Sequence, residues 1–300
     1  MIATRDRCSD LRRTCDRIRA LQPPPNEVLI CADGCSDGTV DMARTEFPDF
    51  VLLENLTALG SVRSRDRMLR LANSDVVLSL DDDSYPLAED FFASLSKVFT
   101  AHPEAAVISF PELRDGDVFS CKSKTNQSKG HYVSAYANCA AAMRREFYLR
   151  QAGFPPFFVH MYEEPDYALQ CYSARSAVWF EPSLVIRHHL STVGRTHMRR
   201  HHQNARNELW SVWMRCPWPW APLVSLFRVW RQFRYAYLEG FAWAVREPIW
   251  WFHAVAGAHR CVQARSPISW PRYYAWMRLA RNPALSVSDG SIRELQSQPL

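Results

Sequence analysis

The first 110 residues alternate short apolar runs with helical patterns, and this alternation constrains the fold more than any other feature. Four apolar runs have the length of buried strands: 27–31, 51–54, 76–80 and 105–110. Three helical patterns lie between them: 39–46, 62–71 and 87–99. A strand–helix repeat of about 25 residues predicts an α/β fold, in which helices cover a mostly parallel, Rossmann-like sheet.

Two acidic segments lie where predicted strands end. Asp33 and Gly34 follow the first of the four runs, and Asp81, Asp82 and Asp83 follow the third. In open α/β sheets ligands bind beyond the carboxyl ends of the strands, so we expect both segments at one site. Three neighbouring carboxylates repel one another unless a cation neutralises them, and hard oxygen ligands suit Mg²⁺ or Mn²⁺ with a phosphate-rich ligand. The alternative is a solvated acidic loop.

The pattern after residue 110 is less regular. Residues 111–134 are polar and predict a long loop or a hairpin that crosses the site. Further strands are predicted at 138–143, 178–180 and 184–187, and further helices at 145–152 and 164–172. Beyond His189 the pattern is wholly helical.

Charge and tryptophan are distributed unevenly along the chain. Residues 187–300 hold 16 Arg and no Lys against 5 acidic residues, a balance of +11, whereas residues 1–186 hold 20 basic and 26 acidic residues, a balance of −6. Ten of the 11 Trp lie between Trp210 and Trp276. We therefore predict a domain over 1–205 and a basic, Trp-rich helical extension over 206–300.

The composition of the extension predicts binding at a membrane surface, or packing on the domain, rather than a membrane-spanning helix. Its longest apolar runs are roughly half of the ~20 residues that a spanning helix needs. Arg interleaved with Trp over 210–280 predicts peripheral contact with an anionic membrane, or equally a helix packed on its own domain with Arg stems over aromatic rings. Nucleic acid is not expected as a partner, because no recognition fold accompanies the charge.

The nine cysteines are scattered, odd in number and without a CxxC pair. This usage indicates reduced thiols in the cytoplasm rather than a disulfide framework or a zinc site. We expect a cytoplasmic protein, in peripheral contact with the inner face of the plasma membrane if the extension binds lipid.

Seven segments, in this order, resemble signatures of the family 2 glycosyltransferases with the GT-A fold, of the bacterial surface-glycan type. They are 2–7, 32–39 (ADGCSDGT), 55–66, 80–83 (LDDD), 138–154, 162–167 (YEEPDY) and 182–188. The resemblance covers roughly residues 1–210. It implies an inverting, metal-dependent enzyme that moves a sugar from a UDP- or dTDP-linked donor to a glycan or lipid-linked acceptor in cell-surface polysaccharide biosynthesis.

The resemblance also implies site residues on the donor side. Asp83 would hold the metal, with Asp81 or Asp82 contacting metal or ribose, and His188 would ligate the metal or contact the diphosphate. Four further residues would bind the nucleotide: Thr4, Arg5, Asp33 and Arg65.

On the acceptor side, Glu164 lies where the family places its catalytic base, and Glu163 and Asp166 would orient or replace it. Crowded carboxylates raise one another's pKa, which makes a better proton acceptor near neutrality.

Some positions depart from the family pattern. Ala32 stands where Asp is commoner, and Met1 lies almost inside the first strand, so that either this strand is short or the chain starts further upstream. These departures leave a second class open, a catalytically degenerate domain that serves as a scaffold for a membrane assembly. A sugar-phosphate nucleotidyltransferase is the third, although its Gly-rich loop is missing at Arg5–Arg7.

Overall fold

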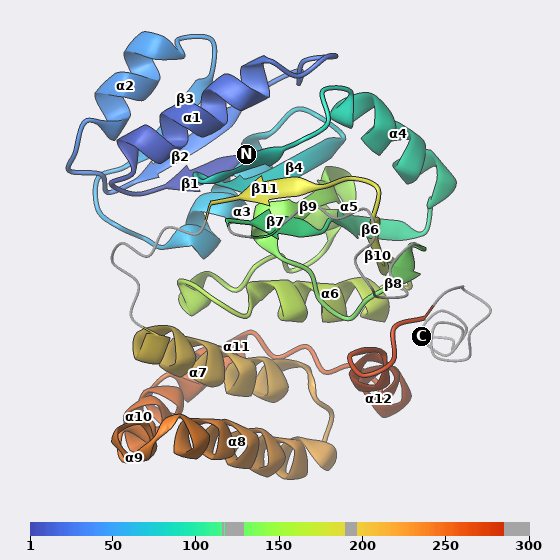
Figure 1. Ribbon diagram of the computed structural model, residues 1–300. Helices are drawn as coiled ribbons and strands as arrows, with labels where there is room; N and C mark the ends of the chain where they lie inside the picture. The colour runs from blue at the N-terminus through green and yellow to red at the C-terminus, as the bar shows by residue number, and fades with distance from the viewer. Residues whose placement is uncertain (116, 118–128, 190–196, 285–300) are drawn as a thin grey trace.

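The computed structural model describes residues 1–115, 117, 129–189 and 197–284, and its centre is an eight-stranded sheet (Figure 1). The strands, in spatial order, are β3 (Val51–Asn55), β2 (Leu29–Asp33), β1 (Ile2–Thr4), β4 (Val76–Asp81), β9 (Ala141–Arg144), β6 (Ala105–Ser109), β10 (Ala177–Phe180) and β8 (His131–Tyr132). The first four pair in parallel, as do β6 and β10, whereas β9 runs antiparallel to both of its neighbours. The predicted mostly parallel α/β sheet is confirmed.

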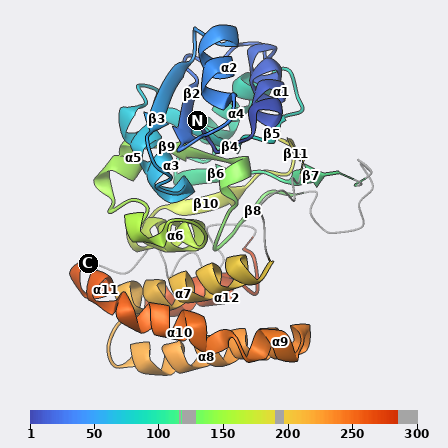
Figure 2. The same ribbon diagram turned by 90° about the vertical axis from the view of Figure 1, so that its left-hand side faces the viewer.

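Helices cover both faces of this sheet, which is why its strands are continuous apolar runs. The helices of the first part are α1 (Cys8–Arg19), α2 (Thr39–Glu46), α3 (Ser61–Leu71), α4 (Phe91–Ala101), α5 (Arg145–Arg150) and α6 (Glu163–Ser173), with 3₁₀ turns η1 (Asn138–Ala140) and η2 (Pro156–Phe158). Helices α1, α2 and α4 lie on one side of the sheet, and α3, α5 and α6 lie on the other (Figures 1 and 2).

A small second sheet places a distant histidine beside the strand-end acids. Its order is β5 (Ser84–Pro86), β11 (Ile186–His188) and β7 (Glu112–Arg114). In the antiparallel pairing of β5 with β11, His188 lies opposite Ser84, the residue that follows Asp83. In the parallel pairing of β11 with β7, His188 lies opposite Arg114.

The rest of the described chain is helical, as predicted. It comprises α7 (His197–Arg215), α8 (Trp220–Glu239), α9 (Phe241–Ala244), α10 (Glu247–Ala256), α11 (Ala258–Gln263) and α12 (Trp270–Leu279). Helix α7 lies beneath α6, and α8 lies on the far side of α7 from the sheet (Figures 1 and 2). The predicted domain boundary at residue 205 falls inside α7, and the division into two domains stays a prediction. Among the described residues, no helix has both the length and the apolar character to cross a membrane.

Several local features differ from the predictions. The strand predicted at 138–143 begins only at Ala141, because 138–140 form the 3₁₀ turn η1. Helix α1 was not predicted, because it is rich in charged residues and buries only a narrow stripe that includes Leu11, Cys15 and Ile18. Helix α4 begins four residues later than expected, since residues 87–90 form a turn between β5 and the helix. Strands β7 and β8 belong to different sheets, so the ends of 111–134 do not pair as a hairpin; residues 116 and 118–128 lie outside the described part.

Candidate active site

The carboxyl ends of β1 and β4 meet through hydrogen bonds to the acidic triplet. Thr4 Oγ1 donates to Asp82 Oδ2 at 2.9 Å. Arg7 Nη1 donates to Asp82 Oδ1 at 3.2 Å and to Asp83 Oδ2 at 3.0 Å. Burial raises the pKa of Asp82 to about 7 against the opposing charge of Arg7, and the charges of Asp81 and Asp83 add to the rise. Asp82 is thus held in place by protein groups.

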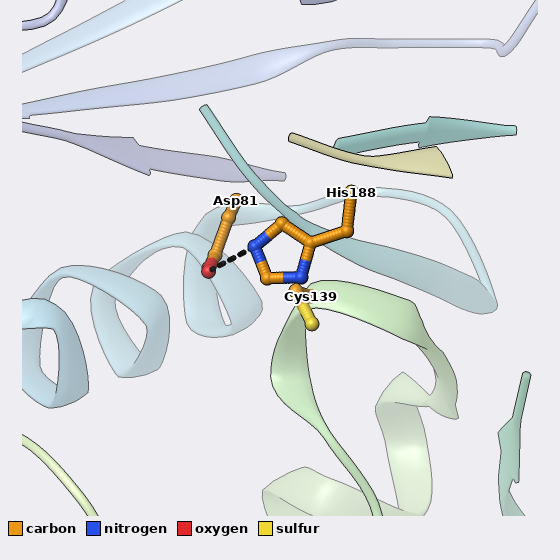
Figure 3. A group of neighbouring side chains, drawn as sticks. All are labelled: Asp81, Cys139 and His188. Atoms are coloured by element: carbon orange, nitrogen blue, oxygen red, sulfur yellow. Dashed lines mark ion pairs between the residues drawn. The ribbon is translucent and has the colours of Figure 1, made fainter. Parts of the chain in front are cut away.

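His188 lies at the centre of the remaining carboxylates. Its Nε2 is 3.9 Å from Asp81 Oδ2 (Figure 3). The same Nε2 is 3.2 Å from Asp83 Oδ1, and Nδ1 is 2.7 Å from Glu112 Oε2. Burial lowers the pKa of His188, but hydrogen bonds with Asp83, Cys139 and Glu112 outweigh it and raise the pKa to about 12. The imidazole therefore offsets only part of the negative charge that surrounds it.

The same groups have the chemistry of a site for a hard divalent cation. Ligand atoms of Asp81, Cys139 and His188 all lie within 4.8 Å of one another (Figure 3). Burial raises the pKa of Cys139 to about 12, so its thiol stays protonated and is a poor ligand. The remaining donors are carboxylate oxygens and Nε2 of His188, which would give up its proton to ligate a cation, while Glu112 fixes the other ring nitrogen. This donor set fits Mg²⁺ or Mn²⁺.

Arg65 connects the strand-end acids to a second group of carboxylates. This buried residue of α3 forms an ion pair with Asp81. Burial lowers the pKa of the guanidinium, but the charges of Asp81, Glu163 and Glu164 raise it by more. The pKa of Arg65 is therefore above its ordinary value. One buried cation thus faces both groups of acids.

The second group lies at the N-terminus of α6. Asn138 Nδ2 donates to Glu163 Oε1 at 3.1 Å, and the Asn138 backbone N–H donates to Glu164 Oε1 at 3.4 Å. Glu163 Oε2 is buried and accepts no hydrogen bond from the described residues. Burial followed by the charge of Glu163 raises the pKa of Glu164 to about 8, and burial also raises the pKa of Glu163. Because the charges of Arg65 and Asp81 both act on Glu163, the two groups of acids lie close together in one site.

Asp166, one turn into α6, makes a different set of contacts. Its two oxygens accept hydrogen bonds from Arg215 Nε and Nη2 at 3.2 and 3.1 Å, from Ser211 Oγ at 2.8 Å and from Gln170 Nε2 at 2.9 Å. The carboxylate is fully buried and ties α6 to α7. These contacts describe a structural ion pair.

Asp33 and Arg5 also differ from the other predicted residues. Asp33 accepts hydrogen bonds from Asn55 Nδ2 and from the backbone N–H groups of Leu59 and Gly60, each at 2.8 Å. Its carboxylate therefore shapes the loop that enters α3. The Arg5 side chain is 60% exposed and lies 3.8 Å from Asp6. Contact of either residue with a nucleotide stays a prediction.

The segment that leads into α6 has an unusual backbone. Val159, Met161 and Tyr162 have φ of 66°, 75° and 69°, the left-handed region that side chains rarely adopt. Asn207 of α7 holds this segment, because its Nδ2 donates to the carbonyl oxygens of Phe158, His160 and Met161 at 3.1, 2.9 and 2.8 Å. The strained turn sets the direction in which the side chains of Glu163 and Glu164 point from the start of α6.

A family model described as glycosyl transferase family 2 matches residues 1–228. The chain belongs to this family. None of the curated protein sequences compared with it matches.

Solved structures resemble this family member in fold. The mannosyltransferase PcManGT of Pyrobaculum calidifontis, in complex with GDP-Man and Mn²⁺, is 16% identical with a TM-score of 0.57, over 86% of this chain and 85% of its own. Residues 1–349 of S. aureus TarS, in complex with UDP-GlcNAc, are 13% identical with a TM-score of 0.61, over 98% and 89%. GalNAc-T7 with UDP, GalNAc and Mn²⁺ is 12% identical with a TM-score of 0.57, over 71% and 47%. The likeness confirms the GT-A fold.

Several residues of the site were not singled out from the sequence. Arg7 is the third of three charged residues that follow the first strand, and this position is a signal that the sequence offers. Glu112 and Cys139 had no such signal, because only the pairing of β7 with β11 and the η1 turn bring them to His188. Asn138 and Asn207 act through amide groups, whose partners the sequence does not reveal.

Proposed function

We propose that this protein is an inverting, metal-dependent glycosyltransferase that moves a sugar from a nucleotide-sugar donor to a glycan or lipid-linked acceptor, in the biosynthesis of a bacterial cell-surface polysaccharide. One observation carries the proposal: the acids around His188 and the acids at the start of α6 face each other across Arg65 and Asn138. Such an arrangement suits a reaction in which a diphosphate leaves on one side and a hydroxyl attacks on the other.

On the donor side, Asp81, Asp83 and His188 would hold Mg²⁺ or Mn²⁺. The ion would neutralise the charge that develops on the leaving nucleoside diphosphate. Arg65 and Arg7 supply further positive charge in partly or fully buried positions.

The nucleotide itself would contact residues at the ends of β1 and β2. We assign ribose and base contacts to Thr4, Arg5, Asp33 and Asp82, with UDP or dTDP as the carrier. Thr4 and Asp82 already share a hydrogen bond, which fixes the direction of both side chains.

On the acceptor side, Glu164 would take the proton from the attacking hydroxyl as the new C–O bond forms and the bond to the diphosphate breaks. A pKa of about 8 matches a base that works near neutrality. Direct displacement on the face opposite the leaving group inverts the anomeric centre. The charge of Glu163 raises the pKa of Glu164 and so keeps it a proton acceptor near neutrality. Asp166 would be a positioning residue rather than a second base, because its carboxylate forms an ion pair with Arg215.

We place the reaction in the cytoplasm. The eight cysteines of the described residues are all free thiols, as expected in a reducing compartment.

A screen of UDP-, dTDP- and GDP-sugars with Mn²⁺, read as release of nucleoside diphosphate, tests the proposal. The native chain should consume at least one donor, and Glu164→Gln should keep nucleotide binding while transfer falls by about 10²–10⁴-fold. A scaffold would bind no nucleotide, and a nucleotidyltransferase would release pyrophosphate instead of a nucleoside diphosphate.

A further inference from the structure

Helix α8 presents an apolar face away from the rest of the molecule. Two views agree that α8 lies on the side of α7 opposite the sheet (Figures 1 and 2). At about 100° per residue, one arc of roughly 120° of this helix collects seven exposed apolar side chains and one arginine. This α8 face consists of Trp220, Leu223, Leu226, Phe227, Trp230, Arg234, Tyr237 and Leu238.

The opposite side of α8 explains how the helix is held. Arg228 and Arg231 form ion pairs with the buried Glu208 of α7, at 3.0 Å for Arg228, while the Arg231 side chain stays 45% exposed. Gln232 Nε2 donates to the same carboxylate at 2.6 Å. Arg228, Arg231 and Gln232 thus hold α8 to α7, whereas apolar side chains face outward, where Trp230 is 56% and Leu226 69% exposed. This is the reverse of an ordinary surface helix.

The helices next to α8 extend the same character. Phe241 of α9 is 81% exposed, and Phe252 of α10 is 72% exposed on a face with Ile249 and Val255. An apolar patch of this extent marks an interaction surface.

Charge identifies the partner. Within the described residues 197–284, seven arginines are exposed against a single exposed acid, Glu239, because Glu208 and Glu247 are buried. The exposed arginines are Arg199, Arg231, Arg234, Arg246, Arg260, Arg278 and Arg281. A second copy of the chain would bring like charges together, whereas an anionic surface attracts them.

We infer that the α8 face binds the surface of an anionic lipid bilayer. The helix lies in the plane of the interface, with Phe227 and Trp230 at the level of the headgroups and acyl chains. Arg234, whose guanidinium lies 5.9 Å from the Trp230 ring centroid, contacts the lipid phosphates beside it. The inference does not depend on the proposed chemistry, because binding to lipid needs no turnover.

Co-sedimentation of the full chain with vesicles tests this inference. One set of vesicles contains about 30% phosphatidylglycerol in phosphatidylcholine, and the other contains phosphatidylcholine alone. We expect binding to the anionic set only, weakened by salt because the attraction is screened. Phe227→Ser/Trp230→Ser should weaken binding by about tenfold or more, since two exposed rings no longer leave water.

The control is Leu71→Ser/Leu149→Ser, which removes two exposed apolar side chains from the sheet domain and should bind as the native chain does. Arg234→Gln should weaken binding and flatten its salt dependence without loss of fold, measured by circular dichroism. Equal binding of the native chain and the α8 double variant overturns the inference, as does no binding to anionic vesicles. A monomer–dimer equilibrium that the α8 double variant abolishes, without lipid binding, assigns the face to a second copy instead.

Discussion

Removing the Asp166 carboxylate is predicted to destabilise the fold rather than to remove a catalytic base. In Asp166→Ala, the buried Arg215 loses its bidentate partner, and Ser211 and Gln170 lose an acceptor. Breaking a buried ion pair from one side costs about 3–5 kcal/mol, because the remaining charge stays buried without compensation. At about 2 °C per kcal/mol for a chain of this size, Tm should fall by roughly 6–10 °C.

Urea unfolding followed by far-UV circular dichroism measures this loss. The matched variant is Asp166→Leu/Arg215→Met, which removes both charges and should recover at least half of the lost free energy of unfolding. Nucleotide-sugar turnover at a temperature well below Tm should change much less in Asp166→Ala than in Glu164→Gln. The reasoning is wrong if Asp166→Ala unfolds within about 1 kcal/mol of the native chain while turnover falls a hundredfold or more.

Further predictions concern the base and the turn before it. Because the pKa of Glu164 is raised to about 8, kcat/KM of the native chain should rise with pH up to about 8 and level off above it; a profile that is flat between pH 6 and 9 would exclude Glu164 as the base. The raised pKa also means that folding favours the protonated form, so this stabilisation is present below the ordinary pKa of 4.5 and is lost as pH rises through about 8. Glu164→Gln should therefore be more stable than the native chain above pH 8 and equal to it at low pH, as thermal unfolding across pH will report. Gly60→Ala should cost about 1–3 kcal/mol, because Gly60 has φ of +97° and a Cβ would lie 2.4 Å from the Val159 carbonyl oxygen. Gly38→Ala, where a Cβ meets nothing within 4 Å, is the matched control. If urea unfolding shows that both variants lose the same free energy of unfolding, the close contact of Gly60 with Val159 does not require glycine.

The apolar runs of the sequence predicted six of the eight strands of the sheet, because buried strands are continuous apolar runs. Strand β1 was indicated only by the family resemblance, and β8 lies in a segment predicted as a loop or a hairpin. The apolar pattern also brought Asp81–Asp83 and Asp33 to one edge, since parallel strands share the direction of their carboxyl ends. The apolar pattern does not predict helix α1, because its buried stripe is narrow and its other side is charged.

The site contacts that the sequence did not predict join residues far apart in the chain. Asp166 and Arg215 are 49 residues apart, and His188 and Glu112 are 76 apart, so neither contact has a local signature. The left-handed backbone at Val159, Met161 and Tyr162 was equally hidden, because glycine, the usual sign of positive φ, is absent there.

Calorimetric titration of UDP, dTDP and GDP, with and without Mn²⁺, tests the central claim most directly. The native chain should bind one of these nucleotides in the presence of Mn²⁺ and lose most of that affinity without it, because the acids around His188 repel a bare diphosphate. Asp83→Ala should abolish the effect of the metal, whereas Asp41→Ala, an exposed acid of α2, should leave it unchanged. Nucleotide affinity that is equal with and without Mn²⁺, or unchanged in Asp83→Ala, would contradict a metal-dependent donor site at this edge of the sheet.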